Sequence, residues 1–516
     1  MDDYIMSMLK LSHKYIGILL AYFGFFLFFS GTLGYYKDEI TLFMQPENYR
    51  LNYKSPNALK SGIDYLRKYH ANADIWEITL PSETSTFVGV SYKNDKKAHQ
   101  KKKNKPRINI DPESGERVKA RSTYGGNFIG KLHFNLWYIP ASKGREIVGY
   151  ATLLLILTIV TGVIIHKRIF KDFFKYRKNT ILRDTHIVTS VSGFAIFFML
   201  SVSGLYLVEK FMLKEIYQDI SSKNQAAMQQ DFYEKAKAKR EARRKVKQNK
   251  EQNATETVSE IVVKQNQSSY IPTLSDIKNI IDKKLNGREL KNILIQKDAV
   301  DTAYIQLNFD TKNPFSENGL SFSAELYNIK TGKLVDMMSQ RELNTEQKIY
   351  QFMKIFHTRN FSDEMVKFIF FVFGILGLFM CFGGALLWQK NSNSTLTFYL
   401  GRFLNGSIFI GLFTGFGMYL LSNQLIKFNT PLRHNLEVNA FFIALIISTL
   451  LSAILVKRYA YTILSFITSF LFLVSAIMAL KAGSYANFSS LKVTLFCFVL
   501  VTLFGYLGKK FLKGKK

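Results

Sequence analysis

Four histidines stand at the ends of long apolar runs, and they recur in the same order in two halves of the chain. They are His13 and His133 in the first half, and His186 and His357 in the second. A Ser-Gly dipeptide follows the opening histidine at the same interval in both halves, at Ser30-Gly31 and at Ser203-Gly204. Such repetition is typical of paired membrane architectures, and histidines at corresponding depths in both copies indicate a shared chemical task.

Apolar runs of membrane-spanning length occupy much of the chain, so the sequence predicts a polytopic α-helical membrane protein. A helix needs about 20 mostly apolar residues to cross a bilayer. The first run is too long for the apolar part of a cleavable signal, and no small-residue cleavage site follows it, so we expect it to persist as an anchor. The eight predicted spans are 15–36, 147–166, 187–208, 366–388, 400–421, 437–456, 460–480 and 488–508.

Lysine and arginine outnumber aspartate and glutamate by 69 to 39, which gives a net charge of +30. In a soluble protein, this excess would suggest nucleic-acid binding. Here we expect no nucleic acid, because part of the excess lies in short loops between spans. Two further basic runs, 96–105 and 235–250, are interpreted as solvated surface, with lipid headgroups or an anionic ligand as the alternative partners.

The cation-rich short connections predict the orientation in the membrane. Loop 167–183, the pair Lys457-Arg458 and the tail 509–516 would lie in the cytoplasm by the positive-inside rule. Eight spans would bring both termini to that same side. The two long polar regions, 37–146 and 209–365, would then lie outside.

Both long polar regions have the same order of predicted elements, a short amphipathic helix followed by strands. A charged insertion at about 215–268 precedes the second helix and is interpreted as a solvated helix or a partly disordered segment. The predicted elements are a helix at 55–69 and strands at 75–80, 86–92 and within 106–118 in the first region, then a helix at 274–285 and strands at 292–296, 303–309 and within 323–335 in the second.

This doubled order resembles the PepSY-associated transmembrane family, over about residues 10 to 390. In each half a histidine-headed span precedes a helix and strands with a tight turn, a second histidine and a glycine-containing span. The turns read D-P-E-S-G-E at 111–116 and N-I-K-T-G-K at 328–333. The family includes inner-membrane iron-uptake and ferric-siderophore reductases. Two features depart from its pattern: His166 stands where the second half has Trp388, and four spans after residue 400 lie outside the resemblance.

The resemblance implies a bacterial inner-membrane protein with an internally repeated four-helix core and two periplasmic α+β PepSY-like domains. The apolar runs add four further C-terminal helices, and the positive-inside rule places both termini in the cytoplasm. The expected division is a first span at 1–36, a first periplasmic domain at 37–146, two spans and a cytoplasmic loop at 147–208, a second periplasmic domain at 209–365, a fourth span at 366–390 and the C-terminal four-span region at 391–516.

The resemblance also implies b-type haem, whose iron needs two neutral imidazoles from facing helices when it transfers electrons. Repeat symmetry pairs His133 with His357 at the outer face and His13 with His186 at the cytoplasmic face, which gives two haems. His166 also lies at the cytoplasmic face, where it could replace one ligand or bind a haem propionate. The alternative for every one of these histidines is structural, because an interfacial imidazole can also reach the headgroups or cap a helix.

The other histidines and the cysteines are interpreted without a chemical role. His70, His99 and His434 fall in soluble segments or short loops and are expected on the solvated surface. Cys381 and Cys497 lie within spans, where buried and inert thiols are the usual state. Most glycines of the first four spans are expected to serve close helix packing.

Electron transfer across the membrane to a ferric chelate, in iron uptake, is therefore the leading functional hypothesis. The sequence contains no glycine-rich motif for binding a nicotinamide cofactor and no P-loop motif for binding ATP. Quinol or a separate cytoplasmic reductase would therefore donate the electrons. The alternatives are a non-enzymatic PepSY protein that binds peptide, protease or cell-wall partners, and a siderophore transporter. The last four spans would serve as a scaffold, a quinol surface or a docking site for a partner.

Overall fold

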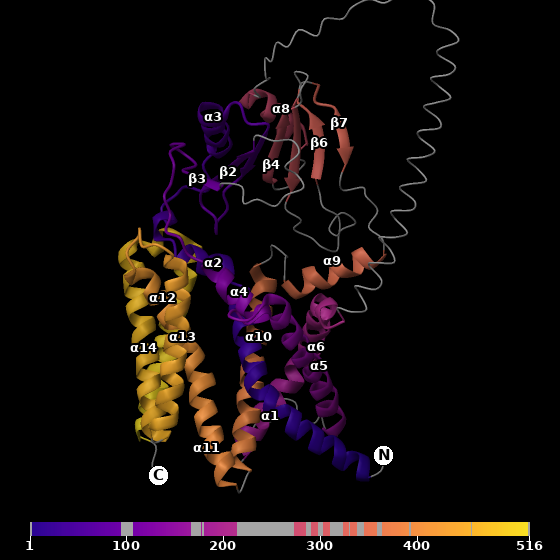
Figure 1. Cartoon of the computed structure of the whole chain (residues 1–516), viewed down its shortest axis with the longest axis vertical. Helices are drawn as coiled ribbons and strands as arrows, with labels where there is room; N and C mark the ends of the chain where they lie inside the picture. The colour runs from indigo at the N-terminus through magenta and orange to yellow at the C-terminus, as the bar shows by residue number, and fades with distance from the viewer. Residues whose placement is uncertain are drawn as a thin grey trace, which may run out of the picture.

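A computed structural model shows a sheet domain placed above a group of long helices (Figure 1). Both chain termini lie at the end of the helices away from the sheet (Figure 1). We call the sheet's side of the membrane the sheet side and the other the terminal side. The structure describes residues 3–93, 107–166, 177, 180–213, 273–284, 290–297, 303–309, 324–329, 331–337, 345–358, 364–391, 394–455 and 457–513. The predicted insertion at 215–268, the basic runs 96–105 and 235–250, and His99 lie outside these residues.

Eight helical segments of the described chain are long and apolar enough to cross a membrane, which confirms the predicted spans and the fold class. Each corresponds to one predicted apolar run and extends beyond it at one end or at both. The helices are α1 (Asp3–Gly34), α5 (Ala141–Ile165), α6 (Ile181–Met212), α10 (Glu364–Lys390), the segment α11 (Thr395–Leu404), η5 (Asn405–Ile410) and α12 (Gly411–Leu425), then α13 (Arg433–Ile454), α14 (Lys457–Ala482) and α15 (Phe488–Lys513).

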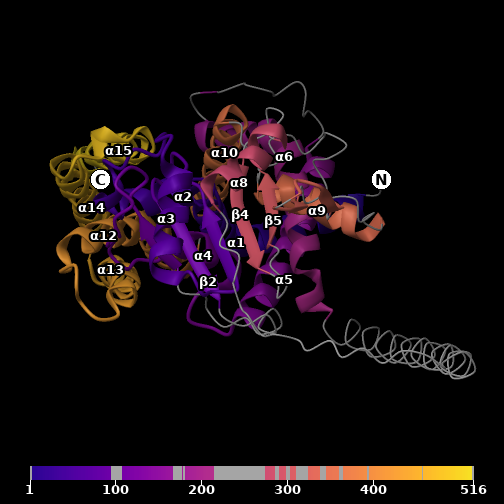
Figure 2. The same ribbon diagram turned by 90° about the horizontal axis from the view of Figure 1, so that it is seen from above.

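The spans form two groups that lie side by side. Seen from above in Figure 2, α5, α6 and α10 lie on one side and α12, α13, α14 and α15 on the other, with α1 between them. We call α1, α5, α6 and α10 the repeat core, and α11 to α15 with η5 the C-terminal unit. Helix α1 has 32 residues, or about 48 Å of length, which exceeds the roughly 30 Å of bilayer hydrocarbon. Its N-terminal half runs obliquely toward the lower end of α5 (Figure 1), and such a tilt is expected for a helix longer than the apolar layer.

Short helices lie at the sheet-side ends of the spans. They are α2 (Lys37–Phe43), the 3₁₀ segment η1 (Pro46–Asn48), α4 (Gly126–Asn135) and α9 (Thr345–Thr358). Helix α4 approaches α2 so closely that a β-carbon at Gly126 would lie 2.1 Å from the carbonyl oxygen of Lys37. Gly125 just before it has a φ of 53°, in the left-handed region that glycine adopts without steric cost. The Gly125-Gly126 pair therefore fixes where α4 begins.

The described strands form one antiparallel sheet in the order β3-β2-β1-β4-β5-β6-β7. Strands β1 and β4 pair directly, so the first and second polar regions share a sheet. Trp76 and Ile78 of β1 face Ile295 and Ile293 of β4, and all four side chains are fully buried. The strands are β1 (Ile75–Thr79), β2 (Val88–Lys93), β3 (Arg107–Ile110), β4 (Leu290–Lys297), β5 (Ala303–Phe309), β6 (Ala324–Asn328) and β7 (Leu334–Met337).

Two amphipathic helices complete the sheet domain, as the sequence predicts. Helix α3 (Ala58–His70) buries Ile63 and Leu66, and α8 (Leu274–Lys284) buries Ile277. These side chains belong to one apolar cluster with the strand residues of both regions. The two regions predicted as separate domains thus share a continuous core. The strand predicted after the turn at 111–116 is reduced to a single bridge between Ile110 and Arg117.

Candidate functional site

The four repeated histidines form two pairs inside the repeat core. His13 of α1 faces His186 of α6, and the centres of their imidazole rings are 6.4 Å apart. His133 of α4 faces His357 of α9, with ring centres 6.2 Å apart. Each pair takes one histidine from each half of the chain, at corresponding positions. The structure therefore brings together the same partners that repeat symmetry predicts.

Each imidazole is held by the backbone of a neighbouring helix through Nδ1. An Nδ1–H that donates to a carbonyl oxygen leaves Nε2 without a proton and with a lone pair for a metal. The same second-sphere arrangement fixes ring orientation in known metal sites. The carbonyl acceptors are Thr158 for His13 at 3.1 Å, Leu27 for His133 at 3.0 Å, Met380 for His186 at 2.9 Å and Leu200 for His357 at 3.1 Å.

A glycine one helical turn after each of these carbonyls makes room for the ring. A β-carbon on any of these glycines would lie within 3.2 Å of the Cε1 atom of the histidine, closer than ordinary van der Waals contact. The pairs are Gly162 with His13 at 3.1 Å, Gly31 with His133 at 3.1 Å, Gly384 with His186 at 3.2 Å and Gly204 with His357 at 2.8 Å. Four histidines therefore use one docking motif, a carbonyl followed four residues later by a glycine.

A hydroxyl side chain precedes the glycine in three of the four docking motifs. Its oxygen lies near the same Nδ1 atom, and it is Thr161 for His13 at 3.2 Å, Ser30 for His133 at 3.3 Å and Ser203 for His357 at 3.1 Å. The fourth motif has Gly383 at this position. Sequence reasoning identified Ser30-Gly31 and Ser203-Gly204, but it did not connect them with Thr161-Gly162 or Gly383-Gly384, and it interpreted most glycines as packing residues. The signal was a small residue followed by glycine in each of the first four spans.

The two pairs lie at opposite ends of the repeat core. Helix α1 contributes His13 to one pair, and its Leu27 carbonyl holds His133 of the other. These positions are 14 residues apart, or about 21 Å along a helix. Helix α6 repeats the arrangement, with His186 and the Leu200 carbonyl separated by the same interval. The pairs thus stand one above the other within the thickness of a bilayer.

The spacing within each pair fits an iron between two imidazoles. An imidazole nitrogen binds a transition metal at about 2 Å and lies about 1.1 Å from the centre of its ring, so two imidazoles across one iron have centres about 6.3 Å apart. All four histidine residues are only partly buried by protein atoms, which leaves surface for a further group to cover. Among the described residues, no cluster of three or more His, Cys, Asp and Glu is arranged to bind a metal ion. Two imidazoles at this spacing fit haem, whose macrocycle supplies the other ligands of its iron.

The electrostatics of the sheet-side pair favour neutral imidazoles. Burial lowers the pKa of His133. Burial, with a smaller contribution from nearby His133, lowers the pKa of His357 to about 4. Both imidazoles are then uncharged at neutral pH, which iron ligation requires.

The remaining candidate residues lie elsewhere. His166 follows the end of α5, where its backbone N–H donates to the Gly162 carbonyl at 3.1 Å. It is therefore close in sequence to the His13 docking motif, but His186 is the ring that faces His13. His70 stacks on Tyr92 in the sheet domain with ring centres 3.6 Å apart.

The start of α13 differs from its prediction as a solvated loop. His434 is half-buried and bonds Ser122 at 3.1 Å. Arg433 is fully buried and forms an ion pair with buried Glu437 at 3.1 Å. The guanidinium also donates to the carbonyls of Asn423, Ile426 and Lys427. Hydrogen bonds to the last turn of α12 and to the two residues that follow this helix thus offset the cost of burying these charges, and the sequence pattern gives no sign of them.

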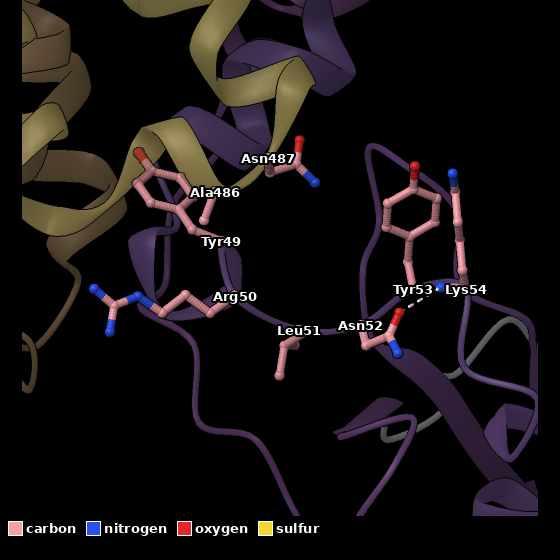
Figure 3. A pocket seen from close by; sticks show the side chains of 8 residues that line it. All are labelled: Tyr49, Arg50, Leu51, Asn52, Tyr53, Lys54, Ala486 and Asn487. Carbon is pink, nitrogen blue, oxygen red and sulfur yellow. Dashed lines mark hydrogen bonds between the residues drawn. The ribbon is translucent and has the colours of Figure 1, made fainter.

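A cavity of about 340 Å³ opens where the segment before α3 meets the connection between α14 and α15 (Figure 3). Its wall includes the cations Arg50 and Lys54 and the buried ring of Tyr49. None of the four paired histidines is among its lining residues, which are Tyr49, Arg50, Leu51, Asn52, Tyr53, Lys54, Ala486 and Asn487. The cavity is therefore separate from the paired imidazoles.

Comparison with known families gives one match. A family model described as the PepSY-associated TM region matches residues 11–391. The matched segment contains both halves of the repeat core, the sheet domain and all four paired histidines, and it ends before the C-terminal unit. A comparison with curated proteins finds no match. The chain is a multi-pass membrane protein that belongs to the PepSY-associated TM region family.

Proposed function

We propose that this protein is a two-haem membrane reductase that passes electrons through the bilayer to ferric iron on the sheet side. The observation that carries the proposal is the pair of facing imidazoles, found twice, with ring centres 6.4 and 6.2 Å apart. Two sites stacked along α1 would form a path across the membrane. The proposed substrate is a ferric chelate such as a ferric siderophore, because hard oxygen chelators hold the less charged ferrous ion less firmly.

The residues of the chain would bind and orient the two haems. When bound, haem supplies a one-electron couple at each site. The backbone carbonyls that accept from Nδ1 hold the four rings in fixed planes, and the docking glycines set the distance of each ring from its supporting helix. The surrounding apolar spans would exclude water from the inner parts of the sites.

The orientation proposed here puts the sheet in the periplasm of a bacterial inner membrane. Both termini lie on the terminal side (Figure 1), and the sequence predicts the cation-rich connections on the same side as the termini, so the positive-inside rule supports this direction. The His133–His357 pair would deliver electrons near the sheet domain. Quinol or a separate cytoplasmic reductase is the proposed donor at the His13–His186 pair.

The spectrum of the purified protein tests this function. Protein from haem-replete cells should be red and low-spin with a reducible Soret band. His133→Ala and His357→Ala should each lose the same haem, because one axial bond rarely retains a six-coordinate b haem. His70→Ala, which changes a histidine of the sheet domain, is the matched control and should keep both haems.

A colourless protein would refute the reductase and favour a role in partner binding or transport. A variant at either sheet-side histidine that keeps full haem content and an unchanged spectrum would refute the assigned pairing.

A further inference from the structure

The C-terminal unit, which lies outside the family match, holds the segment just before α4 along its whole length. Five consecutive residues from Arg121 to Gly125 each form a hydrogen bond with α12 or α13. The bonds are Arg121 to the Asn423 carbonyl at 3.0 Å, Ser122 with His434 at 3.1 Å, Thr123 to Glu437 at 2.5 Å, Tyr124 to Asn435 at 3.3 Å and the Gly125 carbonyl from Tyr419 at 2.9 Å. Helix α4 begins at the next residue.

The other end of α4 is held by the same unit. Three residues after α4 ends, the hydroxyl of Tyr138 donates to Asn439 of α13 at 2.6 Å. Between the two ends, the fully buried ring of Phe128 packs among aromatic rings of α12 and α13, with centres 4.9 Å from Tyr419 and 5.2 Å from Phe441. We call Tyr419, Asn423, His434, Asn435, Glu437 and Asn439 the α4 clamp.

Glu437 is the centre of the α4 clamp. It is fully buried, and its two carboxylate oxygens accept from Thr123 at 2.5 Å and from Asn423 at 2.8 Å, with Arg433 at 3.1 Å. A buried carboxylate is retained only where donors and an opposite charge compensate it. Asn423 and Arg433 belong to the C-terminal unit, and Thr123 belongs to the segment before α4. The carboxylate therefore connects the C-terminal unit with that segment.

The helix that carries the partner histidine is held differently. Helix α9, the counterpart of α4 in the second half, has ring contacts with the repeat core, Tyr350 with Tyr206 of α6 and Phe356 with Phe370 of α10. In Figure 1, α9 lies on the side of the core away from α12 and α14. The clamp therefore acts on the helix of His133, whereas the helix of His357 packs on the repeat core.

We propose that the α4 clamp positions His133 and so sets the haem affinity and redox potential of the sheet-side site. The inference rests on the proposed reductase function. Helix α4 lies between α1, whose Leu27 carbonyl holds the His133 ring, and the clamp, which holds both ends of α4. An imidazole–iron bond tolerates far less than 1 Å of displacement from about 2 Å, so a small movement of α4 changes the bond at His133. The C-terminal unit would then act as a support for the ligand, in addition to spanning the membrane.

The test compares two buried tyrosine hydroxyls. Tyr419→Phe with Thr123→Val removes two clamp bonds, together with the bond that Thr123 Oγ1 accepts from the Gly125 N–H at 3.0 Å, without adding charge or volume. Tyr461→Phe is the matched control, because Tyr461 is also buried and donates to a backbone carbonyl, that of Arg402 at 2.8 Å, within the C-terminal unit. Hydrogen exchange of the α4 amides should become about tenfold faster in the double variant, equivalent to ~1.4 kcal/mol, and stay unchanged in the control.

The second readout is the reductive titration of the haem-loaded protein. The double variant should shift the potential of the haem that His133→Ala removes by at least ~28 mV, a threefold change at 59 mV per tenfold for one electron. The other haem should keep its potential. If the double variant does not fold, Tyr138→Phe replaces it, since this exposed side chain contributes its clamp bond from outside the core.

The outcomes separate the two proposals. Unchanged exchange of α4 would overturn the clamp whether or not haem is present. Faster exchange with both haem potentials unchanged would also overturn the inference, because the clamp would not act on His133. Faster exchange in a protein whose parent is colourless would refute the reductase and the haem role of the clamp, while leaving its hold on α4 established.

Discussion

Replacing Gly204 by alanine should expel one haem and leave the other in place. Gly204 belongs to the docking motif that receives His357, and a β-carbon there would lie 2.8 Å from Cε1 of the imidazole. Carbon atoms in favourable contact are about 3.5 to 4.0 Å apart, so the ring would have to retreat by about 0.7 Å.

That retreat would disturb the present contacts of the ring. Moving it away from α6 would stretch its hydrogen bond to the Leu200 carbonyl from 3.1 Å to about 3.8 Å, beyond hydrogen-bonding distance. The same movement would also change the spacing to His133, whose present 6.2 Å between ring centres matches two iron bonds of about 2 Å each. Overpacking of this kind costs about 1–3 kcal/mol. We therefore expect haem at this site to bind about 5- to 150-fold more weakly.

Haem content per protein and the reduced-minus-oxidised spectrum measure the effect. The haem lost in Gly204→Ala should be the one lost in His357→Ala. Gly130→Ala is the matched control, because no atom lies within 4 Å of a β-carbon at that position and Gly130 is part of α4, the helix that carries His133. It should keep both haems. Full haem content with an unchanged low-spin spectrum in Gly204→Ala would refute the docking geometry.

Two further predictions concern the other site and the direction of transfer. His166→Ala should keep most haem with a modest change in spectrum or potential, because the ring facing His13 is that of His186; loss of a whole haem equivalent there, with retention in His13→Ala, would reassign the ligands. In oriented vesicles, a membrane-impermeant ferric chelate should reoxidise the reduced protein only from the sheet side, and the double variant His133→Ala/His357→Ala should lose this reoxidation; equal rates from both faces would refute directional transfer.

Several elements could be predicted because they depend on local pattern. The spans follow from runs of apolar residues, since a helix in lipid must satisfy its own backbone and present apolar side chains. The helices and strands of the sheet domain follow from amphipathic periodicity and turn residues. Histidine pairing followed from repeat symmetry, because two copies related by a pseudo-twofold bring equivalent residues together. These inferences require no knowledge of long-range contacts.

Other features depend on contacts between segments far apart in the sequence. Pairing of β1 with β4 joins the two polar regions in one sheet. The residue pattern of neither strand specifies which other strand it pairs with. Buried Arg433 and Glu437 look like surface charges in the sequence, because the hydrogen bonds that compensate their burial, besides their own ion pair, come from other segments.

What the sequence by itself determined is the membrane class, the family, the repeat and the identity of the paired histidines. Only the tertiary structure decided what holds each imidazole: the carbonyl and glycine of a different helix, and for His133 a clamp built from the unit after residue 391. The physical reason is that apolar patterning acts along one helix and is set by the solvent around it. Hydrogen-bond acceptors and steric room for a ring come from whichever helix packs alongside, and helix packing in lipid is decided by close fit between small residues and not by hydrophobicity.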